Sequence, residues 1–132
     1  MKPTVCVVVP VYKAEHTIDR CVASILAQDV PGGVSCVRVD DGSPDDSGLL
    51  CDAWAAKSRR VKVVHQEDKG VSSARNAGLA MVDAEFVVFL DSDDALRDGA
   101  LEAAVDAQRQ APDDFVLWHY TDNPNDPAPT GQ

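Results

Sequence analysis

The sequence predicts an α/β fold with a mainly parallel sheet and helices on both faces, and two observations carry this prediction. Short apolar runs alternate along the chain with longer stretches in which apolar residues recur at helical spacing. Strands and helices that alternate in this way favour parallel pairing through right-handed crossovers. No internal repeat is convincing, and 132 residues are enough for one domain with its own core.

Five apolar runs are predicted as strands. The first closes at Pro10, and the second follows the turn at Pro31-Gly32-Gly33. Runs of this length that are rich in valine and phenylalanine are typical of buried strands. The predicted strands are Thr4–Val9, Val34–Val39, Val61–Val64, Glu85–Leu90 and Asp114–Tyr120.

Four intervening segments are predicted as helices. The second is expected to start within Pro44-Asp45-Asp46-Ser47, with acidic residues in its first turn, and the third at Ser72 or Ser73. The apolar positions of the four helices are Ile18, Cys21, Val22, Ile25 and Leu26; Leu50, Ala53 and Trp54; Ala74, Ala77 and Ala80; and Leu101, Ala104 and Val105. The expected domain spans residues 1–120, and residues 121–132, with three prolines, are expected to be a disordered tail.

The charge is distributed unevenly along the chain, whose net charge is −10. Residues 1–66 hold eight basic and eight acidic side chains, whereas residues 67–132 hold four basic and fourteen acidic ones. Proteins that bind nucleic acid neutralise phosphates with basic groups, so this balance argues against a nucleic-acid partner. An anionic small ligand would need a metal ion or local hydrogen-bond donors to offset the repulsion by the negative charge of the protein.

The cysteines indicate a reducing environment. They stand at positions 6, 21, 36 and 51 and form no Cys-x-x-Cys pair, which argues against a zinc site. Buried, reduced thiols are expected, as in a cytosolic protein. The apolar stretch Val5–Val11 is too short for a signal peptide or for a membrane span of about 20 residues. A cytoplasmic location is expected, with peripheral association at the inner face of the membrane as the alternative.

Two aspartate-rich turns follow predicted strands directly, Val39-Asp40-Asp41-Gly42-Ser43 and Phe89-Leu90-Asp91-Ser92-Asp93-Asp94. The carboxyl ends of parallel strands form the edge of the sheet where ligands bind. Clustered carboxylates repel one another, and a cation or a set of donors makes the cluster tolerable. These turns therefore predict a site for a divalent metal with a phosphate-bearing ligand.

Four segments, in this order, resemble the nucleotide-binding half of family-two inverting glycosyltransferases, which have the GT-A fold. They are Val7-Val8-Val9-Pro10-Val11-Tyr12, Val39-Asp40-Asp41-Gly42-Ser43, Gly70-Val71-Ser72-Ser73-Ala74-Arg75-Asn76-Ala77-Gly78 and Phe89-Leu90-Asp91-Ser92-Asp93-Asp94. The resemblance covers roughly residues 3–120. Neither a G-x-G-x-x-G loop nor a Walker A lysine loop follows the first strand, so two other phosphate-binding folds are disfavoured.

The resemblance implies a role for each acidic residue. Asp41 would hydrogen-bond the nucleobase, with Asp40 and Ser43 also serving turn chemistry. In the D-x-D element Asp91-Ser92-Asp93, Asp91 would face the ribose and Asp93 would bind a metal that bridges the diphosphate. Hard oxygen ligands suit Mn²⁺ or Mg²⁺. Asp94 is expected to cap the next segment, with assistance to the metal through water as the alternative.

Three further positions are expected near the nucleotide. Pro10 and Tyr12 stand where the first strand ends, and Tyr12 would either pack on the base or be an ordinary edge aromatic. Arg75 would contact the donor or form an ion pair with an aspartate of the two turns. Lys13 departs from the asparagine common in the family.

His16, His65 and His119 are assigned no catalytic role, because none has a partner at metal-ligand spacing.

The implied activity is inverting transfer of a sugar from a nucleotide-diphospho-sugar, with UDP favoured, to a glycan or other hydroxyl acceptor. Such transfer needs a general base, which in this family lies in an acceptor-binding half beyond the D-x-D. Asp113, Asp114 and Asp122 match no family base motif. The chain is therefore expected to be a donor-binding portion that self-associates or pairs with an acceptor-binding half.

Two other functions stay open. One is a non-catalytic nucleotide- or metal-binding module derived from the same fold. The other is a nucleotidyltransferase, which normally has a glycine-rich loop with Lys or Arg after the first strand. Tyr12-Lys13-Ala14-Glu15 does not supply that loop.

Overall fold

One parallel sheet organises the residues that the computed structural model describes, which are 3–110 and 119–120. Its strand order is β3-β2-β1-β4-β5, and every neighbouring pair is parallel. The strands are β1 (Val5–Val11), β2 (Val34–Asp41), β3 (Val61–Gln66), β4 (Phe86–Leu90) and β5 (His119–Tyr120). The helices are α1 (Ile18–Leu26), α2 (Ser47–Lys57), α3 (Val71–Leu79) and α4 (Ala100–Gln110).

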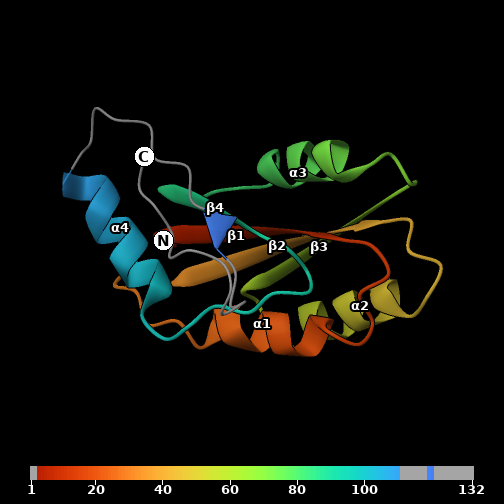
Figure 1. The fold of residues 1–132 in the computed structure, drawn as a ribbon, viewed down its shortest axis with the longest axis horizontal. Coiled ribbons are helices and arrows are strands. Elements are labelled where there is room, and N and C mark those ends of the chain that lie inside the picture. The colour runs from red at the N-terminus through yellow and green to blue at the C-terminus, as the bar shows by residue number, and fades with distance from the viewer. Residues whose placement is uncertain (1–2, 111–118, 121–132) are drawn as a thin grey trace.

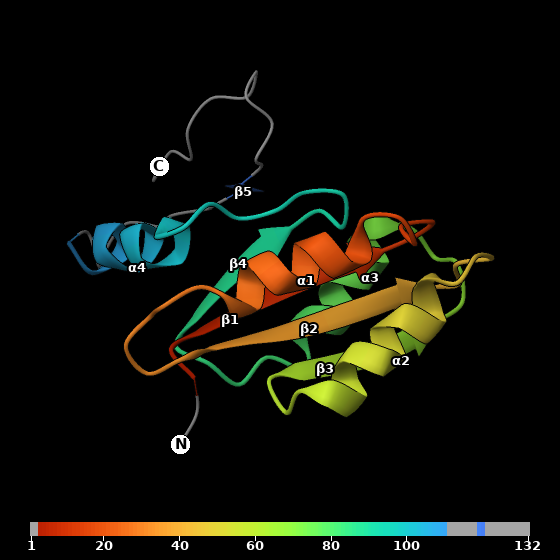
Figure 2. The ribbon, with the colours of Figure 1, turned by 90° about the horizontal axis from the view of Figure 1, so that it is seen from below.

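Helices cover both faces of the sheet, as the alternation predicts. α1 and α2 lie against one face and α3 against the other (Figure 1). In Figure 2, α1 and α2 lie side by side in front of the strands. The larger core cluster fills the α1 side, where α4 contributes Leu101 and Val105, and a smaller one lies under α3. β1 is central and buried on both faces, which explains its unbroken apolar run. The predicted α/β class is confirmed.

Several element boundaries differ from the sequence expectation. β1 continues through Pro10 instead of ending at Val9, because the ladder with β4 stops at Val8 while that with β2 extends to Val11. Pro10 thus lies beyond the β4 ladder, where its missing N–H leaves that ladder intact. α3 begins at Val71 with Gly70 as its N-cap, so neither Ser72 nor Ser73 opens it, and Ala80 is its C-cap.

α2 also differs in its start and in its buried face. It begins at Ser47, so Asp45 and Asp46 precede the helix and do not occupy its first turn. Ala53 is exposed, and Cys51 takes the buried position instead. Of the last predicted strand, the structure describes only His119–Tyr120, which pairs with β4. Asp113, Asp114, Asp122 and the predicted tail lie outside the described residues.

The four thiols are buried and free, as predicted. None of the described helices combines the length and the apolar character that a membrane span requires.

Arg38 is fully buried in the middle of β2, in a segment predicted as an apolar strand. The thiols of Cys21, Cys36 and Cys51 lie close to its guanidinium group, and its three nitrogens find no nitrogen or oxygen acceptor among the described residues. Burial raises the pKa of Cys36 to about 12, although Arg38 acts to lower it, so this thiol is neutral at pH 7. Burial also raises the pKa of the Cys21 thiol, and it raises that of Cys51 to about 11. The guanidinium therefore carries a buried charge that no anion among these thiols balances, which is costly.

Replacing Arg38 by methionine is expected to stabilise the protein. Methionine fills a similar volume without a charge, and comparable replacements of buried charges raise the free energy of unfolding by about 1–4 kcal/mol. Urea denaturation of the Arg38→Met variant measures the change. The exposed Arg59 provides the control, and Arg59→Met should change stability by less than about 0.5 kcal/mol. A destabilised Arg38→Met variant would contradict the view that the buried charge is a net cost.

Lys13 has a left-handed backbone conformation that other residue types adopt more readily than lysine. Its φ is +52°, and it is the one non-glycine residue with positive φ in the described part of the chain. The left-handed region costs most L-residues about 1–2 kcal/mol, while asparagine tolerates it through its short polar side chain. This conformation explains why asparagine is the common residue here in the family that the sequence resembles.

Lys13→Asn is therefore expected to raise the free energy of unfolding by about 1 kcal/mol. Thermal and urea denaturation monitored by circular dichroism give the difference. Lys69→Asn is a matched control, because it removes the same charge at a position without positive φ. Equal effects of the two substitutions would assign the change to charge and not to backbone strain.

Candidate functional site

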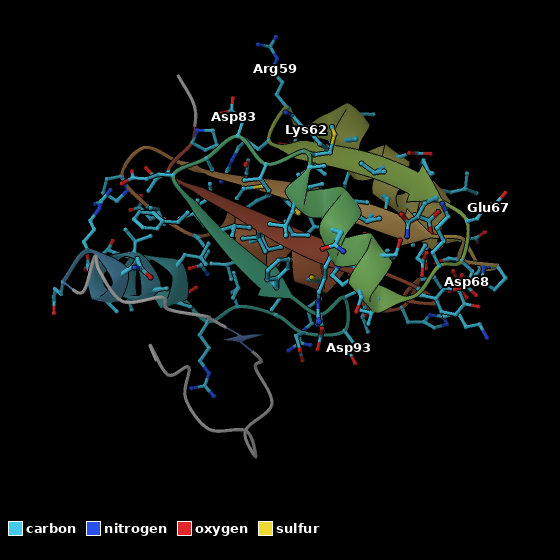
Figure 3. All side chains as sticks on the ribbon, turned by 90° about the horizontal axis from the view of Figure 1, so that it is seen from above. Arg59, Lys62, Glu67, Asp68, Asp83 and Asp93 are labelled. Atoms are coloured by element: carbon cyan, nitrogen blue, oxygen red, sulfur yellow. The ribbon has the colours of Figure 1, made fainter. Side chains whose placement is uncertain are left out.

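A cavity of about 590 Å³ opens at the carboxyl ends of β1 and β4, beside the end of β2 and the start of α3. Six of the seven predicted site residues line it: Pro10, Tyr12, Asp41, Asp91, Ser92 and Asp93. The seventh, Arg75, lies next to it, with its Nη2 3.7 Å from Asp91 Oδ1. Figure 3 shows Asp93 and Asp68 at this end of the sheet, and Arg59, Lys62 and Asp83 at the other.

Asp41 is almost fully buried, with 4% of its surface exposed, and it connects β2 to the loop after β3. Its Oδ1 accepts hydrogen bonds from Gln66 Nε2 (2.8 Å) and the Lys69 backbone N–H (2.9 Å). Its Oδ2 accepts one from the Gly70 backbone N–H (3.0 Å). Burial raises the pKa of this carboxyl, but the donors of Lys69, Gln66 and Gly70 outweigh burial and lower it overall. Asp41 is therefore ionised and held rigidly in the cavity wall.

The turn after β2 depends on Asp40 and Gly42. Asp40 Oδ1 accepts a hydrogen bond from the Ser43 backbone N–H at 3.1 Å, which is the turn chemistry expected for this pair. Gly42 has φ +71°, and a Cβ there would lie 2.8 Å from the backbone nitrogen of Asp68. Only glycine allows the two loops to approach so closely.

Hydrogen bonds also connect the loop after β1 to its neighbours. The Lys13 N–H donates to Ser43 Oγ at 3.2 Å, and the Ala14 N–H donates to the buried Ser47 Oγ at 2.8 Å. Thr17 Oγ1 donates to the Ser92 carbonyl at 3.0 Å, which joins this loop to the turn after β4. The cavity wall is thus braced by bonds among segments that are distant in sequence.

Tyr12 stands at the mouth of the cavity with 42% of its surface exposed. The Lys13 ammonium lies 5.5 Å from the centre of its ring, a distance typical of a cation–π contact. An aromatic face at this position is available for stacking on a planar ligand.

Three carboxylates gather in the turn after β4. Asp91, Asp93 and Asp94 can each place one oxygen so that the three lie within 4.8 Å of one another. Hard oxygen donors of this kind fit Mg²⁺ or Mn²⁺. Asp94 lies six residues before the start of α4 at Ala100, so its capping of the intervening segment stays a prediction. Its backbone N–H donates to the Asp91 carbonyl at 3.0 Å and closes the turn.

Arg75 connects α3 to this acidic turn. Besides its ion pair with Asp91, its guanidinium lies 5.9 Å from the centre of the Phe89 ring. Of the two roles left open by the sequence, the ion pair with an aspartate is present in the structure. A cation at this place lowers the repulsion among the three carboxylates.

Sequence reasoning missed several residues of the wall. His16, Thr17, Asp68, Gly70, Val71 and Ala74 also line the cavity. Asp68 was missed because the third strand was expected to end at Val64, whereas β3 extends to Gln66. Asp68 is two positions past the true end of this parallel strand and therefore lies at the ligand-binding edge.

Comparison with known proteins gives the family. The model of glycosyl transferase family 2 matches residues 6–130. The glycosyltransferase GlyG of Streptococcus pneumoniae is 35% identical over 121 residues, which are 91% of this chain and 40% of GlyG. The chondroitin synthase of Escherichia coli is 34% identical over 123 residues, 93% of this chain and 18% of that protein. The chain thus spans less than half the length of these relatives.

Solved structures give the same result for the fold. S. aureus TarS 1-349 in complex with UDP-GlcNAc superposes with a TM-score of 0.72 at 30% identity, over 81% of this chain and 31% of that one. The mannosyltransferase PcManGT of Pyrobaculum calidifontis, in complex with GDP-Man and Mn²⁺, gives 0.71 at 28% identity, over 80% and 32% of the two chains. With its GT-A sheet and its match over nearly the whole sequence, the chain belongs to glycosyl transferase family 2.

Proposed function

We propose that this chain binds the nucleotide-sugar donor of a glycosyltransferase in the cavity at the carboxyl edge of its sheet. The observation that carries the proposal is the convergence of Tyr12, Asp41, Asp91 and Asp93 on one cavity. The aromatic face of Tyr12 and the buried carboxylate of Asp41 suit the base, and the carboxylates of Asp91 and Asp93 suit the ribose and a metal-bound diphosphate.

Asp41 is the residue proposed to select the base. Its Oδ2 accepts one N–H within the described structure, so it has a lone pair left for a donor from the ligand. The imide N–H of uracil is such a donor, which favours UDP. The complex of TarS with UDP-GlcNAc supports this choice. The GDP-Man complex of PcManGT means that the fold by itself does not fix the base, so the preference needs a direct test.

Asp93 is the proposed metal ligand, with Asp91 and Asp94 in reach of the same ion. A bound Mg²⁺ or Mn²⁺ would offset the charge that develops on the leaving nucleoside diphosphate. The ion pair with Arg75 restrains Asp91, so that its side chain is held toward the cavity. The Mn²⁺ present in the PcManGT complex supports this assignment.

Transfer to a glycan acceptor with inversion is the activity proposed for a protein in which this domain works together with an acceptor-binding part. The greater length of the relatives supports the existence of such a part. General-base assistance is worth about 10²–10⁴ in rate, so the 132-residue chain by itself is expected to bind donor and to transfer sugar slowly. Slow hydrolysis of a UDP-sugar would distinguish a transferase domain from a module that only binds nucleotide.

Nucleotide binding is expected to depend on the metal. Calorimetric titration should show that UDP binds at least about tenfold more tightly with Mn²⁺ than with EDTA, because a divalent ion offsets the repulsion between diphosphate and carboxylates. Asp93→Ala should abolish this difference. Asp83→Ala, which removes an exposed carboxylate at the other end of the sheet, should leave it intact. If the unmodified chain bound UDP equally well in Mn²⁺ and in EDTA, the proposed role of the metal in nucleotide binding would be wrong.

Base recognition by Asp41 gives a second test. UDP should bind well and ADP and GDP poorly, and Asp41→Asn should weaken UDP binding by about 1–3 kcal/mol, the cost of a mismatched hydrogen bond. The amide would also turn a donor toward the N–H groups of Lys69 or Gly70, so denaturation curves are needed to separate folding from binding. Tight binding of ADP that Asp41→Asn leaves unchanged would contradict the assignment.

A further inference from the structure

His65 lies between two carboxylates at the end of β3. Its Nδ1 is 2.9 Å from Asp40 Oδ2, and its Nε2 is 2.7 Å from Asp52 Oδ1. An ionised carboxylate can only accept hydrogen bonds, so both ring nitrogens must carry a proton for both contacts to be favourable. This geometry requires an imidazolium ion, which joins β2, β3 and α2.

A glycine in α2 makes room for this arrangement. A Cβ on Gly48 would lie 2.6 Å from Asp40 Oδ2 and 3.6 Å from His65 Cε1. Glycine within a helix costs about 1 kcal/mol relative to alanine, and no positive φ requires it here. The close approach of the carboxylate and the ring accounts for the glycine, which indicates that the ion pair is a built feature of the fold.

The ion pair acts on the turn that carries Asp41. Asp40 uses its second oxygen, Oδ1, to accept the N–H of Ser43, whose Oγ accepts the N–H of the cavity residue Lys13. Across the two strands Asp40 pairs with His65 and Asp41 pairs with Gln66. Successive residues point to opposite faces, so His65 holds Asp40 on the α2 face while Gln66 holds Asp41 on the cavity face.

We propose that His65 is a positioning residue for nucleotide binding, which as an imidazolium ion fixes the turn from Asp40 to Ser43 and weakens the site when it loses its proton. The inference rests on the proposed nucleotide-binding function for its effect on affinity. His65 does not line the cavity and contacts Asp40 on the α2 side of the sheet, so it acts through Asp40 and touches no ligand.

The direction of the pH dependence follows from the neighbours of His65. Hydrogen bonds with Asp52 and Asp40 raise the pKa of His65, and burial opposes them only in part. Cys51 of α2 is near both carboxylates, but burial raises the pKa of its thiol to about 11, so it is neutral in this range. A raised pKa in the folded state means that the stabilisation is complete below the unfolded pKa of about 6.5 and is lost as the pH rises through the folded value.

The experiment combines ring titration with nucleotide binding in the full 132-residue chain. Long-range ¹H–¹⁵N spectra, assigned with His65→Ala, should show both ring nitrogens protonated at about pH 6.5, the unperturbed pKa of histidine. The backbone amides of Ser43, Lys69 and Gly70 should shift with the same midpoint as the ring. Asp52→Asn should lower that midpoint, while Asp83→Asn, an equal change of charge at a distant exposed site, should leave it in place.

The ratio of UDP dissociation constants between His65→Ala and the unmodified chain gives the effect on the site. It should be about threefold to tenfold near pH 6 and fall to about twofold or less near pH 9.5. The ratio cancels the ionisation of the nucleotide's own phosphate and of its uracil imide, which both proteins meet equally. If His65→Ala does not fold, the comparison of Asp52→Asn with Asp83→Asn replaces it, because Asp52→Asn keeps the ring.

Amides of Ser43, Lys69 and Gly70 that do not follow the ring, or a ring midpoint that Asp52→Asn leaves unchanged, would overturn the inference. A UDP ratio that stays constant with pH would overturn it as well. Absence of UDP binding at every pH, with amides that still follow the ring, would instead reject the proposed nucleotide function and support the control of the turn by His65.

Discussion

The carboxylate of Asp41 is the point on which the geometry of the site depends. It ends β2 and accepts three hydrogen bonds, of which two come from backbone N–H groups in the loop that leads into α3. Those bonds fix where α3 begins and therefore where Arg75 stands relative to Asp91. A buried carboxylate with fewer donors would be protonated or displaced. One ionised group thus positions the loops after β2 and β3 directly. Through α3 and Arg75 it also positions the turn after β4.

Other carboxylates at the carboxyl edge of the sheet are also paired with donors or cations. Asp40 faces His65 and the N–H of Ser43, Asp45 accepts from the N–H of Ser47, and Asp91 faces Arg75. The site therefore tolerates its density of acids, because most of them are paired with donors or cations inside the protein. Asp93 is exposed, and its charge faces the cavity. Negative charge is in this way concentrated where a cation from solution could bind.

Patterns of apolar residues were sufficient to predict the strands, the alternation with helices and the edge at which the acids gather. They were insufficient where tertiary packing decides the outcome. Arg38 was assigned to a buried strand only through its neighbours, and nothing local predicts that its charge would be enclosed by three thiols. Cys51 and not Ala53 faces the core, because the packing of α2 against β3, α1 and β2 sets which of its faces is buried.

In the candidate site, too, local sequence predicts some residues and tertiary packing decides others. Motifs located Asp41 and the D-x-D turn, since their chemistry is carried by adjacent residues. The partners of His65 are 13 and 25 positions away in sequence, so no spacing rule could associate them. Asp68 could be predicted as a site residue only from the true end of β3. That end depends on the pairing of β3 with β2 and not on the apolar content of β3 itself.

The pairing of Asp40 with His65 and of Asp41 with Gln66 has a consequence for how the chain folds. A slip of β3 by one residue against β2 would turn His65 and Gln66 to the wrong face. Asp40 would then be buried on the α2 side without its cation, and His65 would meet Asp41 in the cavity wall. Such a misaligned sheet is penalised by electrostatics in addition to the loss of apolar packing. These four residues, of which Asp41 is proposed to recognise the ligand, thus also favour one register of two valine-rich strands that apolar packing alone would distinguish poorly.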